Sequence, residues 1–504
     1  MMQVTRAVRR GNLKGNGMER RDMDGKRPQT VTPAAGVLAA ALAATVLGGC
    51  ASGPDYVAPA VAAPAAYRRA PAPAPAARTA PVELAHWWRG FDDPELARLV
   101  ELALAQNLDL QAAAARVEQA RAAARAAGAA LRPTIDLQAG VTAQHQSLES
   151  PFGAIASRFP GYDRNRVLRE DGLAASWELD VAGGLRRGVE QRNAEVEVAQ
   201  AQGLGVRVSL AAEVADSWLR IRGARLRLAI AQEQLDADRK LLDLVVERRR
   251  GGLATAGEQA QAEARVAQLK ASLAPLHAEA ETQSNRLDVL LGGAPGTYSA
   301  QRAETPRPLA LPALGSDLEP AELLRRRPDV VAAERRLAAS SAAIGVASAA
   351  YYPSLSLSAL LGFQSLHGVR PDGARFQPTL AAGLRWRLFD FGAIDADVAR
   401  AQAANREALL AYRQAMLRAT EDVENALATS TWLDEERGAL LEQVDAAGRA
   451  RAQAHDAYLG GAASLIDELE LDRDYLAARD RLSRVETDAA RARVASFRAL
   501  GGGW

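Results

Sequence analysis

Cysteine is nearly absent from this chain of 504 residues, which has one Cys, five Met and 5 % aromatic residues. One cysteine excludes a disulfide framework, a multi-cysteine zinc module and an iron–sulfur centre. A formal net charge of +1 argues against nucleic-acid binding as the main function. The histidines show no metal-ligand spacing: His86, His145, His277, His367 and His455. With no phosphate loop and no Ser/His/Asp arrangement indicated, we expect neither an enzyme nor a cofactor.

Proline is absent between Pro160 and Pro275 and again after Pro378. Because proline breaks helix interiors, such tracts predict very long helices. Residues 184–250 would span about 100 Å if helical. Gly pairs then interrupt the pattern, so we predict two long helical hairpins, 184–291 and 393–500. Helices of this length with Ala-rich seams suit side-by-side packing as coiled coils.

The N-terminal 50 residues have the features of a secretory leader. A basic stretch precedes an apolar run over 34–47, which is too short to favour a transmembrane helix. Residues 47–50 (LGGC) are similar to a bacterial lipobox, so we expect a lipoprotein signal peptide over 1–49 and lipidation of Cys50. The true start is left open among Met1, Met18 and Met23. Ala51 favours the outer membrane over retention in the inner membrane.

Without this leader the chain has 54 basic and 58 acidic residues, so the mature protein is mildly acidic. The Ala/Pro-rich residues 50–90 are expected to form an extended tether.

An internal duplication organises the rest of the chain. Pro133 matches Pro353 at an offset of 220 residues, and Trp177 matches Trp386 at an offset of 209. The change of offset places 11 extra residues around 147–170. We expect repeat 1 over 91–293, a linker over 294–319 and repeat 2 over 320–504.

Each repeat contains two segments that alternate apolar and polar residues, typical of transmembrane β-strands. We expect these strands at 134–145, 172–181, 354–364 and 379–389. The alternative is an ordinary half-buried sheet. Four strands cannot close a barrel, and a membrane tolerates no free sheet edge. Two chains would supply eight strands and three would supply twelve, and the residues alone leave that choice open.

Several motifs together resemble the TolC-type outer-membrane efflux proteins, within them the lipidated, NodT-like drug-efflux channels. The motifs that carry the resemblance are 53–56 (GPDY), 87–94 (WWRGFDDP), 325–330 (RRRPDV), 386–390 (WRLFD) and 458–461 (YLGG). The resemblance covers essentially all of 50–504.

This resemblance implies a mainly α fold with membrane β-strands: a homotrimer with a twelve-stranded barrel, four strands per chain, continued by a long α-helical barrel. The implied function is passive efflux of small molecules such as drugs from the periplasm to the exterior. The implied partners are a periplasmic adaptor (membrane fusion) protein, an inner-membrane resistance-nodulation-division transporter and outer-membrane lipid through Cys50, with no nucleic acid.

The resemblance also implies a gate near the tips of the long hairpins. Asp467 and Glu470 would form carboxylate rings, with Ile466 as an apolar constriction and Arg473 as a pairing base. Tyr458 matches a tyrosine of the family, and by the 209 offset Glu258 occupies the position of Asp467 in repeat 1. The alternative for the carboxylates is a solvated acidic helix face. The turns at Gly252, Leu253, Gly461 and Ala462 resemble the tips that meet the adaptor, although glycine at such turns also serves simple helix reversal.

The chain has few soft sulfur ligands, and this limits the class of cargo that it can favour. Only Met416 remains in the mature chain, which argues against copper or silver. Cys50 favours small-molecule efflux over a type I protein-secretion channel. The remaining rival is a lipid-anchored structural coiled-coil rod without a pore.

Overall fold

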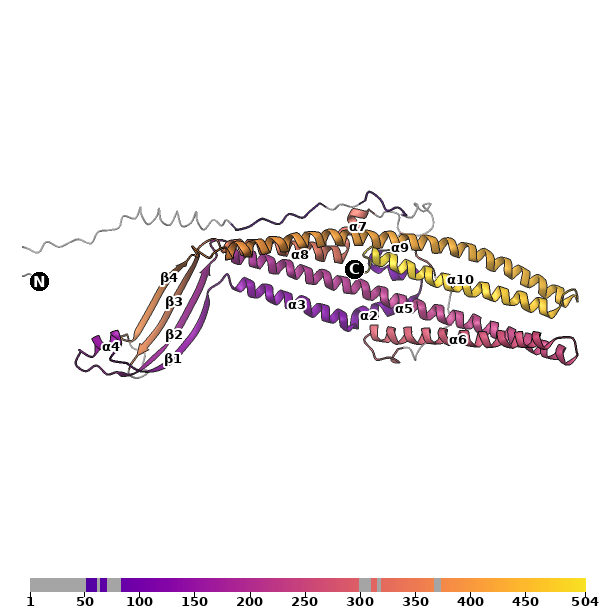
Figure 1. Ribbon diagram of the computed structural model, residues 1–504, viewed down its shortest axis with the longest axis horizontal. Coiled ribbons are helices and arrows are strands. Elements are labelled where there is room, and N and C mark those ends of the chain that lie inside the picture. The colour runs from indigo at the N-terminus through magenta and orange to yellow at the C-terminus, as the bar shows by residue number, and fades with distance from the viewer. Residues whose placement is uncertain (1–50, 61–63, 70–82, 299–309, 315–318, 367–372) are drawn as a thin grey trace, which may run out of the picture. The chain divides into compact units, whose positions relative to one another are not determined.

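The computed structural model describes residues 51–60, 64–69, 83–298, 310–314, 319–366 and 373–504. The leader and Cys50 lie outside the described residues. The elements of the described chain (Figure 1) are η1 (Leu84–Phe91), α2 (Pro94–Gln106), α3 (Leu108–Ala129), β1 (Thr134–His145), α4 (Pro151–Ala156), β2 (Asn165–Leu179), α5 (Gly184–Arg250), α6 (Ala256–Leu290), α7 (Pro320–Arg326), α8 (Pro328–Ala349), β3 (Ser354–Ser365), β4 (Phe376–Arg385), α9 (Ala393–Leu459) and α10 (Leu465–Ala499).

The two repeats have matching helices. Helices α5 and α9 are 67 residues each, α6 and α10 are 35 each, and α3 and α8 are 22 each. The first residues of α5 and α9 are 209 apart, and those of β1 and β3 are 220 apart. These are the two offsets in the sequence, and the change between them falls in the β1–β2 connection.

Glycines with positive φ lie at the starts and at the turns of the long hairpins. Gly183 and Gly392 precede α5 and α9 with φ of 77° and 88°. Gly252 and Gly461 reverse the chain with φ of 72° and 74°, a conformation that a side chain would strain. The single proline within α6, Pro275, leaves that helix continuous.

The four strands form one antiparallel sheet in the order β1-β2-β3-β4. The expected strand 172–181 began too late, because β2 pairs along the whole of β1 from Asn165 opposite His145. The charged residues of its first half break the alternation without breaking the backbone pairing. The expected strand 379–389 was also misplaced. Strand β4 starts at Phe376 opposite Phe363, and Trp386 already lies beyond its end.

The two tryptophans that revealed the repeat make the same hydrogen bond. The Trp177 indole N–H donates to the Leu131 carbonyl at 3.0 Å, and that of Trp386 donates to the Tyr351 carbonyl at 3.0 Å. Each accepting carbonyl lies two residues before the proline that ends a helix. The bond therefore fixes the junction between helix and strand identically in both repeats.

The sheet has two unlike faces. Large apolar side chains on one face are strongly exposed, for example Leu137 at 78 % and Leu380 at 81 %. The register places Ile135, Val141 and Leu361 on the same face, whereas the opposite face carries Thr, Gln, Ser and Gly with few large apolar residues. An ordinary half-buried sheet would cover its apolar face with the core, and this chain leaves that face uncovered.

The main core lies among η1, α2, α5 and α10. Trp87, Trp88 and Phe91 are at most 1 % exposed, and the Trp87 ring stacks on Phe497 with centroids 5.5 Å apart. The expectation of an extended tether over the whole of 50–90 was therefore wrong at 84–90, which lie in η1. Burying three aromatic side chains outweighs the Ala/Pro-rich character of the surroundings, at about 2 kcal/mol for each ring.

Within the described part of the chain, no helix carries an apolar stretch long enough to cross a bilayer.

Candidate functional site

The two long hairpins end in turns of the same construction. At the first turn the Leu253 N–H donates to the Arg248 carbonyl at 2.8 Å, and at the second the Ala462 N–H donates to the Ala457 carbonyl at 2.8 Å. A Cβ on Gly252 or Gly461 would meet nothing within 4 Å. Leu253 is 72 % exposed. The first turn thus presents backbone and the apolar Leu253 side chain to the surroundings, whereas the second presents backbone and the small Ala462 side chain.

Capping boxes hold two of the expected gate carboxylates. Glu258 accepts from the Thr255 backbone N–H at 2.5 Å, while the Thr255 hydroxyl accepts from the Glu258 N–H at 3.2 Å. Asp467 and Ser464 repeat this arrangement at 3.0 and 3.3 Å. Each pair satisfies N–H groups that the first turn of α6 or α10 would otherwise leave unpaired. Both carboxylates therefore have a structural role within their own chain.

These hydrogen bonds favour the ionised carboxylates. The pKa of Glu258 lies below its usual range because the Thr255 backbone N–H, and then its hydroxyl, donate to the carboxylate. The pKa of Asp467 is lowered by the Ser464 hydroxyl and then by its backbone N–H.

The remaining expected gate residues lie on α9 and α10, beside the turn at Gly461. Glu470 is exposed and Ile466 is half-buried, each on the first two turns of α10. Tyr458 is 37 % exposed at the end of α9. Arg473 donates to the carboxylate of Asp474 at 2.9 Å. The expected pairing of Arg473 with Glu470 is therefore not made within the chain, because the neighbouring carboxylate takes the guanidinium.

A buried arginine clamps the segment that follows Cys50, which the sequence interpretation missed. Arg187 is 5 % exposed, and its guanidinium donates to the Ser52 carbonyl at 3.1 Å and to the Asp55 carboxylate at 2.6 Å. Its other terminal nitrogen donates to Glu190 at 2.7 Å. The hydrogen bonds to the carboxylates of Glu190 and then Asp55 raise the pKa of Arg187, against the opposing effect of burial.

Close backbone contact locks the same segment. The Ser52 N–H donates to the Ala182 carbonyl at 3.0 Å, and its hydroxyl donates to the Gly345 carbonyl at 2.9 Å. Gly53 has φ of +82°, and a Cβ there would lie 2.5 Å from the Gly345 Cα. The chain immediately after Cys50 is thus fixed between the end of β2 and helix α8. The GPDY motif at 53–56 was the available signal.

The RRRPDV motif also has a structural explanation. Arg327 is 8 % exposed and donates to the carboxylates of Asp329 and Asp422, both at 2.8 Å, and to the Ala499 carbonyl at 2.9 Å. It joins the start of α8 to α9 and to the end of α10. The motif therefore marks a packing junction of repeat 2.

Long helical hairpins joined to a sheet with an uncovered apolar face define a class of outer-membrane channel proteins. The model of the family described as "Outer membrane efflux protein" matches residues 99–293 and 320–502, so each repeat is matched, and the chain belongs to this family.

Curated relatives and solved structures agree with this assignment. The chain is 34 % identical to the pyoverdine export outer membrane protein OpmQ of Pseudomonas putida over 83 % of this chain and 88 % of that protein. It is 32 % identical to the outer membrane protein OprJ of Pseudomonas aeruginosa over 94 % and 96 %. The solved outer-membrane channel OprN superposes with a TM-score of 0.79 at 34 % identity, covering 90 % of this chain and all of that one.

The protein is accordingly an outer-membrane efflux channel, the function and location that the resemblance implied. Members of the family are channels rather than enzymes.

Proposed function

We propose that three copies of this chain form a closed tube that serves as the exit duct of a tripartite efflux pump. The observation that carries this is the sheet, which has an apolar face, a polar face and two outer edges, β1 and β4, that pair with no other strand of the described chain. A bilayer requires every strand edge to be paired. Three sheets joined edge to edge give twelve strands with the apolar face toward lipid and the polar face toward water.

The chain path supports one orientation of this tube. Helices α3 and α8 lead into β1 and β3, and α5 and α9 follow β2 and β4, so all four long connections leave from one end of the sheet (Figure 1). Both β-hairpin connections lie at the other end. The helices then extend the duct into the periplasm, and the β1–β2 and β3–β4 connections face the exterior.

The lipid anchor fits this orientation. Ala51 lies against Gly183, at the passage from β2 to α5. Acyl chains on Cys50, one residue earlier, would enter the bilayer at its periplasmic surface. The Arg187 clamp would hold that anchor beside the tube.

The gate in this proposal lies at the far ends of the hairpins. Threefold symmetry would place three copies each of Asp467 and Glu470 around the axis, with Ile466 as an apolar ring. Glu258, Arg473 and Tyr458 lie on the neighbouring surfaces. Close carboxylates repel one another, so their number and spacing would tune how readily the mouth opens.

Six turns would surround the mouth, because each chain contributes Gly252–Leu253 and Gly461–Ala462. Their similar geometry suits a sixfold ring of a periplasmic adaptor, which would in turn connect the duct to a resistance-nodulation-division transporter. A small molecule is the proposed cargo, because lipidation favours that class over protein secretion and Met416 alone cannot line a soft-metal path.

Planar-bilayer conductance of the purified protein tests the channel and its gate. We expect a low wild-type conductance that rises in the Asp467→Ala/Glu470→Ala variant. The matched control is Glu435→Ala/Glu436→Ala, which removes two exposed carboxylates from the middle of α9 and should leave conductance unchanged. Absence of conductance from every variant would overturn the proposed closed tube and its gate. The molecular mass of the purified assembly is a separate measurement, and a mass other than that of three chains would overturn the trimer.

A further inference from the structure

The β1–β2 connection contains the extra residues of repeat 1 and is folded. Ser150 caps the short helix α4 by accepting from the Gly153 N–H at 3.1 Å. Phe152 of α4 and Tyr162 pack edge to face, with ring centroids 6.4 Å apart and planes at 71°. The insertion therefore adds two aromatic side chains at the end of the sheet away from the long helices.

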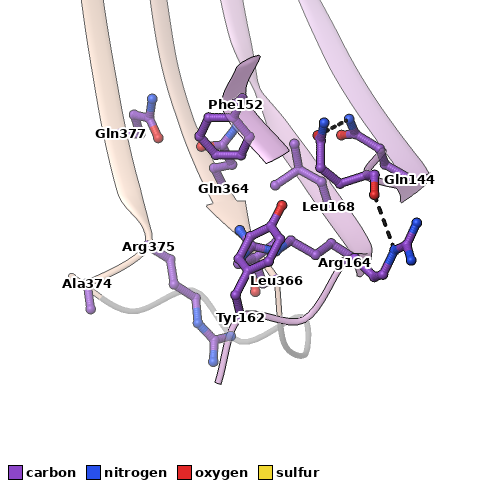
Figure 2. Close-up of a pocket in the computed structure, with 13 residues that line it drawn as sticks. Gln144, Phe152, Tyr162, Arg164, Leu168, Gln364, Leu366, Ala374, Arg375 and Gln377 are labelled. Carbon is purple, nitrogen blue, oxygen red and sulfur yellow. Dashed lines mark hydrogen bonds between the residues drawn. The ribbon is translucent and has the colours of Figure 1, made fainter. Parts of the chain in front are cut away.

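These rings border a cavity of about 660 Å³ on the polar face of the sheet. The strand residues that line it include Gln144, Arg166 and Gln377, and Gln144 pairs directly with Arg166 in the register. In Figure 2, the Tyr162 ring lies between Arg164 on one side and Arg375 on the other. All four strands and both of their connections contribute to its walls.

The lining is positively charged. Three arginines border the cavity, and no carboxylate is among its described lining residues. The Arg164 side chain donates to the Gln146 carbonyl at 3.3 Å, and that of Arg166 donates to the Asp163 carbonyl at 2.8 Å. Within the described chain neither of these two forms an ion pair. The Asp163 carboxylate instead accepts from the Asn165 N–H at 2.9 Å.

One of these arginines also lies over an aromatic face. The Arg166 guanidinium carbon is 4.4 Å from the centre of the Tyr162 ring. The stack holds the guanidinium in place while leaving its terminal N–H groups available to an anion. Positively charged guanidinium groups beside aromatic rings are complementary to a flat molecule that carries a negative charge.

We propose that this cavity binds aromatic anions, such as aryl carboxylates or sulfonates. The ring would pack against Phe152 and Tyr162, and the anionic group would accept from Arg164 and Arg166, with glutamine amides as further donors. That the cavity opens onto the lumen at the outer mouth rests on the proposed trimer. Three such cavities would then surround the exit and draw anions outward, at the opposite end from the acidic mouth.

Calorimetric titration of the purified full-length protein with 1-naphthoate tests the site without requiring an open pore. We expect binding of 1-naphthoate to be clearly tighter than that of 1-naphthylmethylammonium, which has the same rings and the opposite charge. Arg164→Gln/Arg166→Gln should weaken naphthoate binding roughly fivefold or more. The matched control is Arg169→Gln, which lies on the same strand but opposite Val141 on the apolar face, and should bind as the wild type does.

The aromatic contribution is measured separately. Phe152→Leu should reduce the preference for naphthoate over cyclohexanecarboxylate and leave the charge preference intact, because the Tyr162 ring still holds Arg166. Equal affinity for naphthoate and the ammonium compound, or unchanged binding in the double Arg variant, would overturn the site. Conductance with no binding defeats the site alone. Binding with no conductance defeats the channel alone and leaves the site standing.

Placement in the lumen has its own measurement. In the Asp467→Ala/Glu470→Ala background, naphthoate added on the outer side should reduce single-channel current, and Arg164→Gln/Arg166→Gln should raise the blocking concentration by a similar factor. Block that is insensitive to these arginines would overturn the placement of the cavity at the exit.

Discussion

The long helices of repeat 1 and repeat 2 have equal lengths, and the two repeats differ in the segments that are attached to these helices. Repeat 1 holds the N-terminal segment with Arg187, where repeat 2 has Ala396 at the matching position. Repeat 1 also carries the folded connection with Phe152 and Tyr162. Both copies therefore supply the long hairpins and the strands, while the Arg187 clamp and the two aromatic side chains of the proposed anion site belong to repeat 1 alone.

The largest expected effect concerns the contact that ties the segment before repeat 1 to the last helix of repeat 2. Trp87 precedes repeat 1 and stacks on Phe497 in the last helix of repeat 2. Trp87→Ala should lower the free energy of unfolding by about 3–5 kcal/mol, because it opens a cavity at a fully buried site. Denaturant unfolding in detergent, followed by helical circular dichroism, measures the change.

Trp432→Ala is the control for this substitution, since Trp432 is 55 % exposed on α9. It should cost about 1 kcal/mol or less. Equal losses for the two variants would show that the packing of this segment on repeat 2 does not depend on the Trp87 contact.

The clamp specific to repeat 1 should give the next largest effect. Arg187→Met leaves the Ser52 carbonyl without its guanidinium donor, and should release the segment 52–56 at a cost of about 2 kcal/mol. Hydrogen exchange of peptides that contain these residues measures the release directly.

The matched control for the clamp is Arg192→Met, on the same helix. Arg192 is 49 % exposed and pairs only with Glu195 of its own helix at 2.7 Å among the described residues. Its loss should leave exchange at 52–56 unchanged. If Arg187→Met also leaves it unchanged, the segment is held by the close approach of Gly53 and Gly345 instead.

These outcomes concern features that the sequence revealed unequally. The long hairpins followed directly from the absence of proline and the Gly pairs, because local backbone preferences alone set their ends. Strand β2 was misplaced, because Arg166, Arg169 and Glu170 obscure the alternation and pairing with β1 is a long-range property. Helix η1 was missed, because its burial depends on Phe497, some 400 residues away.

The candidate site, like the fold, could be predicted from the sequence only in part. The turns at Gly252 and Gly461 were evident, and T-x-x-E at 255–258 is a recognisable capping box. The resemblance assigned Asp467, and by the 209 offset Glu258, to a gate without showing that each carboxylate already caps a helix start. The Arg187 clamp could not be read, because one arginine among 62 basic residues carries no mark of burial.

A smaller effect should be equal in the two repeats. Trp177→Phe and Trp386→Phe each delete one indole N–H bond to a carbonyl at 3.0 Å, and each should cost about 1 kcal/mol. Thermal unfolding of the two single variants gives the comparison. A cost confined to one of them would show that the helix–strand junctions have diverged despite their common geometry.

The smallest expected effect is a pH dependence at the hairpin tips. The pKa values of Glu258 and Asp467 are lowered in the folded chain, so their contribution is present above the unfolded pKa and is lost as pH falls through the folded pKa. Hydrogen exchange at the starts of α6 and α10, corrected for intrinsic rates, should therefore accelerate at acid pH by similar factors.

Glu258→Gln and Asp467→Asn separate this capping role from the gate. Each variant should remove the acid-induced acceleration at its own helix start and leave the other tip unchanged. If acceleration persists in both, other groups control the fraying. Because protonation of Asp467 would loosen α10 and also discharge the proposed acidic ring, conductance that rises in Asp467→Asn but not in Glu258→Gln would assign the gate to the tip of repeat 2. A rise in both would make the two tips equivalent.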